Sequence, residues 1–286
     1  MPATIHDLLV SGRDRLDEAG IDDAELSVRY LLEHLLSKSN SQLQSDLYET
    51  VSDEISLHFE DLIEKRAAHH PLQYLIGEVE FYNVKLKVDN RVLIPRPETE
   101  ILVEHVIEFL QSRIAPKILD IGTGSGNIAI ALAANVNDAF VTSVDISSEA
   151  LDLARENARL NKVGDNVSFI RADCLDKDFW NMIGKFDAVI SNPPYVDSRD
   201  YAGLQPEVRD YEPKVALVND QGPLVFFEVI AENIPNVLTE KGLLCFEIGA
   251  GQAPDVTPII KKYLPSSEIK IVKDLNGIDR VITALT

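Results

Sequence analysis

The stretch Asn192-Pro193-Pro194-Tyr195 has residue types that could carry chemistry, and it directly follows the apolar run 186–191. An apolar run rich in Val and Ile predicts a buried strand, and the prolines end it because they lack the N–H that a strand ladder needs. They also stiffen the loop, so the Asn192 side-chain oxygen and the Pro193 carbonyl oxygen can act as fixed hydrogen-bond acceptors. With a Tyr195 ring to stack on, this arrangement suits a planar nitrogen that carries two hydrogens, as in an amide or an exocyclic base amine.

Such a nitrogen is a poor nucleophile because its lone pair is delocalised, the effect that gives the peptide bond its rotational barrier of about 18–20 kcal/mol. Acceptors that hold both N–H bonds would act by positioning the nitrogen and by stabilising developing positive charge, without a strong base. All six histidines, of which His105 is the last, precede the predicted sheet, which argues against a His-dependent hydrolase there. A plain turn is the alternative interpretation, since Asn-Pro and Pro-Pro are common in loops.

A glycine-rich loop, with glycines at 122, 124 and 126, is the second candidate for chemistry. Glycine permits a sharp turn and lets a ligand approach the backbone. A dinucleotide fingerprint would need glycine at 127, where the chain has Asn, and the P-loop motif is absent. The spacing Asp-x-Gly-x-Gly-x-Gly, beginning at Asp120, resembles motif I of the class I S-adenosylmethionine-dependent methyltransferases.

Two further aspartates suit that cofactor. Asp145 ends the next apolar run, about twenty residues on, where a carboxylate can bind both ribose hydroxyls. Asp173 ends the third run, placed to accept from the adenine amino group, with Cys174 beside it. Each feature is common in α/β folds, but their order and spacing favour S-adenosylmethionine. The predicted cofactor-binding residues are Gly122, Thr123, Gly124, Ser125, Gly126, Asp145, Asp173, Cys174 and Asn192.

The elements that must position these residues alternate between short apolar runs and helical stretches from Lys117 to Ser191. This alternation predicts βαβ units and a parallel sheet. Because ligands of open α/β sheets bind beyond the carboxyl ends of the strands, the candidate residues would share one edge. Two late apolar runs, 268–274 and 280–285, have no helix between them and predict an antiparallel pair at one edge of the sheet.

Upstream of the sheet, apolar residues at helical spacing predict a small helical domain, and Thr4 and Asp7 have the spacing of a capping box. Partial alternation after residue 77 predicts a β-hairpin, and Pro97 is placed to begin a helix. We therefore expect a helical domain at 1–72, a hairpin linker at 73–95 and a sheet domain at 96–286; the family resemblance described below implies that they are the substrate-recognition domain, the linker and the methyltransferase catalytic domain.

The composition and the net charge limit the classes of partner that this chain is expected to bind. With 47 acidic and 27 basic residues, the formal charge of −20 repels a phosphate backbone and argues against direct nucleic-acid binding. Cys174 and Cys245 stand far apart, so neither a disulfide nor a metal site is expected. Neither a signal-peptide pattern nor an apolar run of membrane-spanning length is present, which predicts a cytoplasmic protein that does not bind membranes.

Longer blocks carry a closer resemblance. The chain from about residue 70 onward contains "LIPRPETE" (93–100), "LDIGTGSG", "SNPPYV", "VRDYEPKVALV" and "NGIDRVI". Together these are similar to the bacterial HemK/PrmC family, the peptide chain release factor N5-glutamine methyltransferases. Motif I and the Asn-Pro-Pro-Tyr block occur in several methyltransferase families, whereas "LIPRPETE" joined to them is far more specific.

The resemblance implies a Rossmann-like, seven-stranded, mostly parallel sheet and a five-helix N-terminal domain that helps to hold the release factor. S-adenosylmethionine would methylate the glutamine of the release factor's Gly-Gly-Gln loop and leave S-adenosylhomocysteine. Asn192 and Pro193 would hold the glutamine amide, and Pro194 and Tyr195 would shape its pocket. The implied catalytic residues are Asn192, Pro193 and Tyr195. Cys174 departs from the larger aromatic that some relatives have near the adenine, which leaves its role open.

Several alternatives stay open. An ion-pair network and direct substrate contact are equally favoured for Arg96, Glu98 and Glu100, and a structural role near the site is favoured for Arg209, Glu212 and Pro213. A sister enzyme that methylates a ribosomal-protein glutamine is the second candidate, and only the N-terminal region could distinguish it from a release-factor methyltransferase. An N6-adenine DNA methyltransferase would need a basic face, and a non-catalytic binding module would have lost the glycine loop or Asn192.

Overall fold

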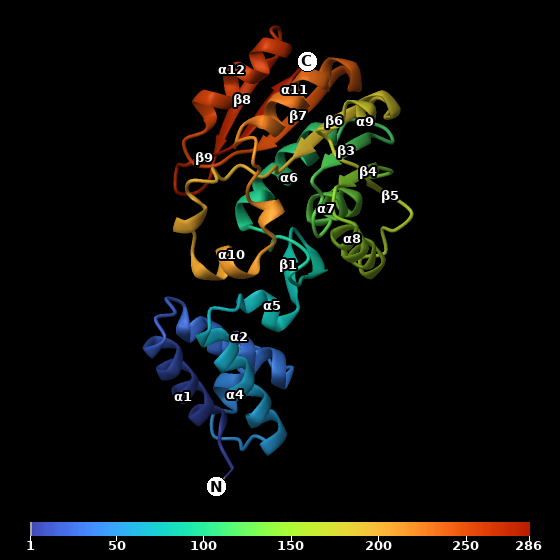
Figure 1. The fold of residues 1–286 in the computed structure, drawn as a ribbon. Coiled ribbons are helices and arrows are strands. Elements are labelled where there is room, and N and C mark those ends of the chain that lie inside the picture. Colours follow the sequence, from blue (N-terminus) through green and yellow to red (C-terminus); the bar gives the residue numbers. More distant parts are fainter. Residues whose placement is uncertain (1) are drawn as a thin grey trace. The chain divides into compact units, whose positions relative to one another are not determined.

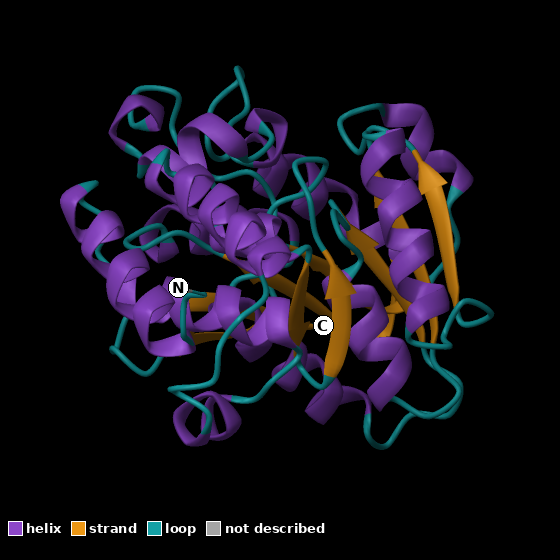
Figure 2. Ribbon diagram, turned by 90° about the horizontal axis from the view of Figure 1, so that it is seen from below, coloured by secondary structure: helices purple, strands orange, loops and turns teal. Residues whose placement is uncertain are grey.

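The computed structural model describes residues 2–286, which divide into two units. The helical unit ends at Glu78 and also includes Gln205–Tyr211, and the sheet unit comprises Val79–Leu204 and Glu212–Thr286. Figure 1 traces the elements of both units along the chain, and Figure 2 distinguishes helices from strands. Within residues 2–286, no helix is both long and apolar enough to cross a membrane.

The helical unit is built on amphipathic helices whose apolar faces meet in one core. Its helices are α1 (Ile5–Glu18), α2 (Ala24–Leu36), α3 (Asn40–Ser45), α4 (Asp53–Ala67), α5 (Leu72–Ile76) and α10 (Pro206–Tyr211). The predicted capping box begins α1, since Thr4 Oγ1 accepts from the Asp7 N–H and Asp7 accepts from the Thr4 N–H. Leu16, Leu31, Leu32 and Phe59 are buried in the shared core.

Arg66 is a buried cation in this unit, with 3% of its surface exposed. Its guanidinium donates to Asp23 Oδ1 at 2.7 Å, to Glu207 Oε2 at 2.5 Å and to Ser27 Oγ at 3.0 Å. Glu207 lies on α10, which is 141 residues further along the chain. The ion pair therefore holds a late segment of the sequence against α2 and α4.

Replacing Arg66 with Met is expected to lower the free energy of unfolding of the helical unit by about 2 kcal/mol. The loss is below that of a fully buried pair because the side chains of Asp23 and Glu207 stay 41% and 32% exposed and keep part of their hydration. Urea unfolding followed by circular dichroism measures it. The matched control is Lys65→Met on the same helix, which removes an exposed pair with Asp61 and should change stability by less than about 0.5 kcal/mol. Equal losses in the two variants would contradict the prediction.

The sheet unit contains a seven-stranded sheet of order β5-β4-β3-β6-β7-β9-β8. Its strands are β3 (Lys117–Ile121), β4 (Phe140–Asp145), β5 (Val167–Arg171), β6 (Phe186–Ser191), β7 (Leu238–Glu247), β8 (Glu268–Lys273) and β9 (Asp279–Leu285). All neighbours are parallel except β9, which runs antiparallel to β7 and β8. This confirms the predicted α/β fold, with its mostly parallel sheet and its antiparallel pair at one edge.

Both faces of the sheet are covered because its strands alternate their side chains between two cores. Ile118 packs in the core on one face, and the next residue, Leu119, packs in the core on the other. The first face carries α6 (Pro97–Leu110), α7 (Asn127–Asn135), α8 (Ser148–Leu160) and the two-stranded sheet of β1 (Glu78–Phe81) and β2 (Val84–Lys87). The second face carries α9 (Lys177–Met182), α11 (Val225–Val237) and α12 (Ala253–Tyr263).

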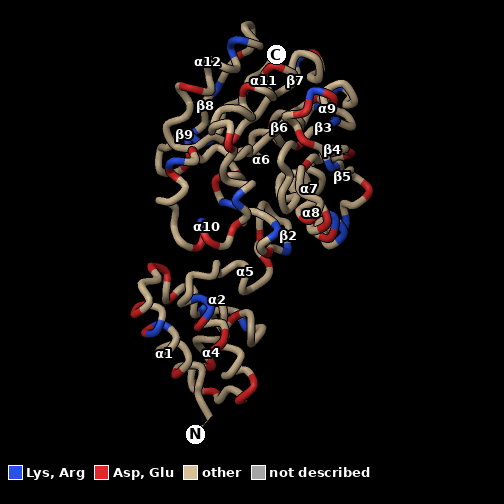
Figure 3. The backbone as a smooth tube through the Cα atoms, in the orientation of Figure 1, with Lys and Arg blue, Asp and Glu red and all other residues tan. Residues whose placement is uncertain are grey.

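The remaining short elements are two 3-10 turns, η1 (Tyr201–Gly203) and η2 (Lys214–Ala216). They flank the segment that carries α10, between β6 and α11. Figure 3 colours the backbone by residue type and shows Lys and Arg positions dispersed among those of Asp and Glu. Among the described residues, the basic positions are thus scattered among the more numerous acidic ones.

Candidate active site

The glycine loop joins the end of β3 to the start of α7 in a conformation that favours glycine. Gly122, Gly124 and Gly126 have φ values of +79°, +52° and +82°, in the left-handed region. A Cβ on Gly126 would lie 2.9 Å from Ile130 Cδ1 and 3.2 Å from Ala154 Cβ. Gly126 therefore allows α7 and α8 to pack closely, whereas the other two glycines shape the loop itself.

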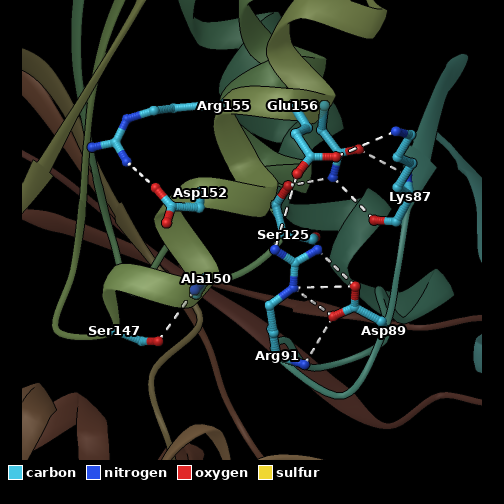
Figure 4. Close-up of polar contacts among 10 residues, drawn as sticks. Lys87, Asp89, Arg91, Ser125, Ser147, Ala150, Asp152, Arg155 and Glu156 are labelled. Carbon is cyan, nitrogen blue, oxygen red and sulfur yellow. Dashed lines mark hydrogen bonds and ion pairs between the residues drawn. The ribbon is translucent and has the colours of Figure 1, made fainter.

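Hydrogen bonds from a neighbouring helix fix the position of this loop. The buried Asn157 of α8 donates through Nδ2 to the Ser125 carbonyl oxygen at 2.9 Å and accepts from the Lys87 N–H at 2.7 Å. Figure 4 shows Lys87 and Ser125 in this network, and Arg91, which donates through Nε to Asp89 Oδ1 and through Nη2 to Asp89 Oδ2. One amide thus ties the glycine loop to β2.

Asp145, at the end of β4, is held by backbone N–H groups. Its Oδ2 accepts from the Gly124 N–H and its Oδ1 from the Ser147 N–H, both at 2.9 Å. Burial raises the pKa of this carboxyl, and the hydrogen bonds from Ser147 and Gly124 oppose that change. The carboxylate is therefore fixed in orientation beside the loop.

Asp120 lies within β3, fully buried, and neither of its carboxyl oxygens has a hydrogen-bond partner of ordinary geometry among residues 2–286. Burial raises its pKa from 3.8 to about 7, although the neighbouring Thr123 hydroxyl partly opposes that change. A buried carboxylate without a partner is costly in the folded chain. A positively charged ligand bound beside the glycine loop, which Asp120 precedes, would stabilise its ionised form, although Asp120 does not itself line the cavity.

The raised pKa of Asp120 makes a pH-dependent stability testable. Between pH 3.8 and about 7 the folded chain keeps a proton that the unfolded chain has released, so stability falls as pH rises through this window. Asp120→Asn carries no charge, and without cofactor its gain in Tm over the parent should be about 5 °C larger at pH 8 than at pH 5. Thermal unfolding at both pH values measures it, with the exposed Asp152→Asn as control. A gain that is the same at both pH values would refute the account.

Asp173 and Cys174 follow β5 at the same edge of the sheet. Asp173 Oδ1 accepts from the Leu175 N–H at 2.9 Å, and the Cys174 carbonyl oxygen accepts from Trp180 Nε1 at 2.8 Å. Burial raises the pKa of the Cys174 thiol to about 12, so it stays protonated at neutral pH. Cys174 thus presents a small, uncharged side chain.

The Asn-Pro-Pro-Tyr loop is anchored on both sides. Ser191 Oγ donates to the Ile121 carbonyl oxygen at 2.8 Å, which fixes the end of β6 against β3. Gln252 Nε2 donates to the Tyr195 carbonyl oxygen at 3.1 Å, and the Val196 N–H donates to the Leu217 carbonyl oxygen at 3.0 Å. These bonds and the two prolines make the loop a rigid mount for Asn192.

One cavity brings most of the predicted residues together. Its lining includes Gly122, Thr123, Gly124, Ser125, Asp145, Asp173, Cys174, Asn192, Pro193 and Pro194. Gly126 and Tyr195 are not part of this lining: Gly126 packs between α7 and α8, and the Tyr195 hydroxyl lies 3.5 Å from Glu247 Oε1. Burial raises the pKa of Tyr195, so its hydroxyl stays protonated.

Arg96 and Glu100 of the "LIPRPETE" block and Glu212 of the "VRDYEPKVALV" block form structural contacts. Arg96 Nη2 donates to Glu212 Oε1 at 2.5 Å, and the Ile94 N–H donates to Glu212 Oε2 at 3.1 Å. Glu100 accepts from the Tyr82 N–H at 3.0 Å. Arg96 also lines the cavity, as Pro213 does. In the helical unit, Arg209 pairs with Asp210.

Two polar residues of the site were missed by the sequence reasoning. Thr99 and Glu247 are buried side by side, with Thr99 Oγ1 donating to Glu247 Oε2 at 2.6 Å, and Asn192 Nδ2 lies 3.4 Å from Thr99 Oγ1. Thr99 lies inside the "LIPRPETE" block, and Glu247 is a single carboxylate in the apolar run 243–248. A single charged residue within an otherwise apolar run was the signal from which Glu247 could have been found in the sequence.

Comparisons with known proteins agree with this geometry. Residues 7–77 match the PrmC N-terminal domain model, and residues 97–205 match the methyltransferase small domain model. A release factor glutamine methyltransferase of Chlorobaculum tepidum is 39% identical over 274 residues, which cover 94% of this chain and 92% of that protein. One of Streptococcus pneumoniae is 42% identical over 235 residues, covering 82% and 81%.

A solved methyltransferase of Pyrococcus furiosus has a TM-score of 0.52 at 18% identity, over 78% of this chain and 98% of that one, which supports the fold alone. The fold and the family models define a class I S-adenosylmethionine-dependent methyltransferase. Within that class, the chain belongs to the release factor glutamine methyltransferase family. The resemblance inferred from the motifs is thereby confirmed.

Proposed function

We propose that this chain transfers a methyl group from S-adenosylmethionine to the side-chain nitrogen, N5, of the glutamine in the Gly-Gly-Gln motif of peptide chain release factors, in the cytoplasm. The observation that carries the proposal is the pair of acceptors at Asn192 and Pro193, which lines the same cavity as the glycine loop and Asp145. Relatives named release factor glutamine methyltransferase support the choice of substrate.

The cofactor would be held by residues that already converge on the cavity. Gly122, Thr123, Gly124 and Ser125 line the cavity and would lie against the amino-acid end of the cofactor. Asp120 precedes this loop and does not itself line the cavity, so it would act on the cofactor's positive charge without direct contact. Asp145 would accept from the ribose hydroxyls, and Asp173 from the adenine amino group, with Cys174 beside it. When bound, S-adenosylmethionine supplies a methyl group on a positively charged sulfur.

Asn192 Oδ1 and the Pro193 carbonyl oxygen would accept the two N–H groups of the glutamine amide and aim its nitrogen at the methyl group. As the N–C bond forms and the C–S bond breaks, the two oxygens stabilise the positive charge that develops on nitrogen. One N–H proton then leaves to water, since an N-protonated amide is strongly acidic. Pro194 would limit the shape of the substrate pocket, and Tyr195, whose hydroxyl lies beside Glu247 outside the cavity lining, would help to keep the loop rigid.

We further propose that the helical unit recognises the release factor, with functional boundaries at 1–72 for recognition, 73–95 for the hairpin linker and 96–286 for catalysis. The matched PrmC N-terminal domain model supports a specialised role for this unit. The net charge of −20 supports a protein substrate over a nucleic acid.

Incubation with a release factor and methyl-labelled S-adenosylmethionine, followed by peptide mass mapping, tests the function. Label on the Gly-Gly-Gln peptide is expected, and it should vanish when that glutamine is replaced with glutamate. Ribosomal proteins and DNA are offered in parallel. An unlabelled Gly-Gly-Gln peptide beside a labelled ribosomal protein or adenine would overturn the assignment.

A further inference from the structure

Behind Asn192, a chain of polar side chains runs into the core. Thr99, in the first turn of α6, is 1% exposed, and Glu247, the last residue of β7, is 2% exposed. Asn192 Nδ2 lies 3.4 Å from Thr99 Oγ1, and Thr99 Oγ1 lies 2.6 Å from Glu247 Oε2. A helix on one face of the sheet and the ends of two neighbouring strands thus converge on one side-chain amide.

The donor and the acceptor of each hydrogen bond between these side chains follow from the hydrogens that each group carries. An ionised carboxylate only accepts, so the single Thr99 hydroxyl proton is committed to Glu247. The Thr99 oxygen can then only accept, and the group of Asn192 that faces it must be the Nδ2 amino group. The other end of the amide, Oδ1, is left for the cavity, where an acceptor is needed.

We propose that Glu247 and Thr99 are positioning residues, which set the orientation of the Asn192 amide so that its oxygen, and not its amino group, faces the substrate nitrogen. This inference rests on the acceptor role of Asn192 in the proposed function. A reversed amide would present two N–H donors to a substrate group that is itself a donor. The long Asn192–Thr99 bond is expected to shorten when substrate fills the cavity.

The charge state of Glu247 gives the arrangement a pH dependence. Burial raises the pKa of this carboxyl to about 7; the Thr99 hydrogen bond and Arg280 lower it, while Glu98 raises it. The Tyr195 hydroxyl also faces Glu247 Oε1, and Arg280 is itself paired with Asp274. Above about pH 7 the ionised Glu247 carboxylate can only accept, so Thr99 donates to it and accepts from Asn192. Below it, a protonated Glu247 can donate to Thr99, and the Thr99 hydroxyl is free to turn toward Asn192.

Steady-state kinetics of three variants test the proposal on release-factor substrate. Thr99→Val and Glu247→Gln should each lower kcat about tenfold at pH 8, with the cofactor Kd within about threefold of the parent. Thr99→Ser, which keeps the hydroxyl, should retain kcat within about threefold. The parent should lose activity as the pH falls below 7, and Glu247→Gln should lack the part of that decline that Glu247 causes. An unchanged decline in Glu247→Gln, or equal losses in Thr99→Ser and Thr99→Val, would overturn the proposal.

A second measurement needs neither substrate nor turnover. In protein labelled with ¹⁵N-asparagine, the side-chain amide signals of Asn192, assigned by their loss in Asn192→Ala, are followed from pH 5.5 to 8.5. They should shift with a midpoint near 7 in the parent, and the shift should be markedly smaller in Glu247→Gln, where Asp120 is the remaining carboxyl with a pKa of about 7. Signals that do not titrate in the parent would refute the network. Titrating signals in a protein that leaves release factors unmethylated would instead refute the proposed function alone.

Discussion

Asn192→Ala is expected to lower kcat for glutamine methylation by about 10³-fold while the Kd for S-adenosylmethionine stays within about threefold. Asn192 supplies one of two acceptors that orient a delocalised, weakly nucleophilic nitrogen, and it is mounted on a loop held by Ser191 and Gln252. Removal of one preorganised group that stabilises developing charge typically costs 10²–10³-fold in kcat, and misorientation of the amide adds to that loss.

Single-turnover methylation of a release factor measures this loss, and calorimetric titration with S-adenosylhomocysteine measures the cofactor affinity. Asn233→Ala is the matched control, because this α11 residue hydrogen-bonds only to the Val229 carbonyl oxygen of its own helix turn in the described contacts. The control should turn over normally. Near-normal turnover in Asn192→Ala would refute the acceptor role, and a parallel collapse of cofactor affinity would point to a structural role.

Asp145→Ala should weaken S-adenosylmethionine binding by about 10²–10³-fold. The carboxylate is proposed to accept from both ribose hydroxyls, and hydrogen bonds to a charged group contribute about 1.5–3 kcal/mol each. The same oxygens accept from the Gly124 and Ser147 N–H groups, so the substitution also releases the glycine loop. Asp145→Asn, which keeps one acceptor oxygen, should lie between the parent and Asp145→Ala.

Calorimetric titration of each variant with S-adenosylmethionine measures these affinities. Asp152→Ala serves as the control, since Asp152 lies on the neighbouring helix α8 and its exposed carboxylate pairs with Arg155. Its Kd should match that of the parent. A Kd within threefold of the parent in Asp145→Ala would show that the ribose is held elsewhere.

Ten of the residues that line the cavity were readable from local patterns. Glycines that end one apolar run, aspartates that end the next two and an Asn-Pro-Pro-Tyr block after the fourth each mark a strand end. Because parallel strands bring their carboxyl ends to one edge of the sheet, such residues meet in space wherever the βαβ order holds. The mostly parallel sheet and the antiparallel edge pair followed from the same short-range signals, whereas the order of the strands is known only from the structure.

The residues that support the cavity were not readable in this way. Thr99 and Glu247 are 148 positions apart, Asn157 and Lys87 are 70 apart, and Arg66 and Glu207 are 141 apart. Which of these residues pair depends on which face of the sheet each helix covers and on how the strands and loops pack in the core. Hydrophobic periodicity shows only which residues are buried. A buried polar group needs a partner, but the identity of that partner is set by packing in three dimensions.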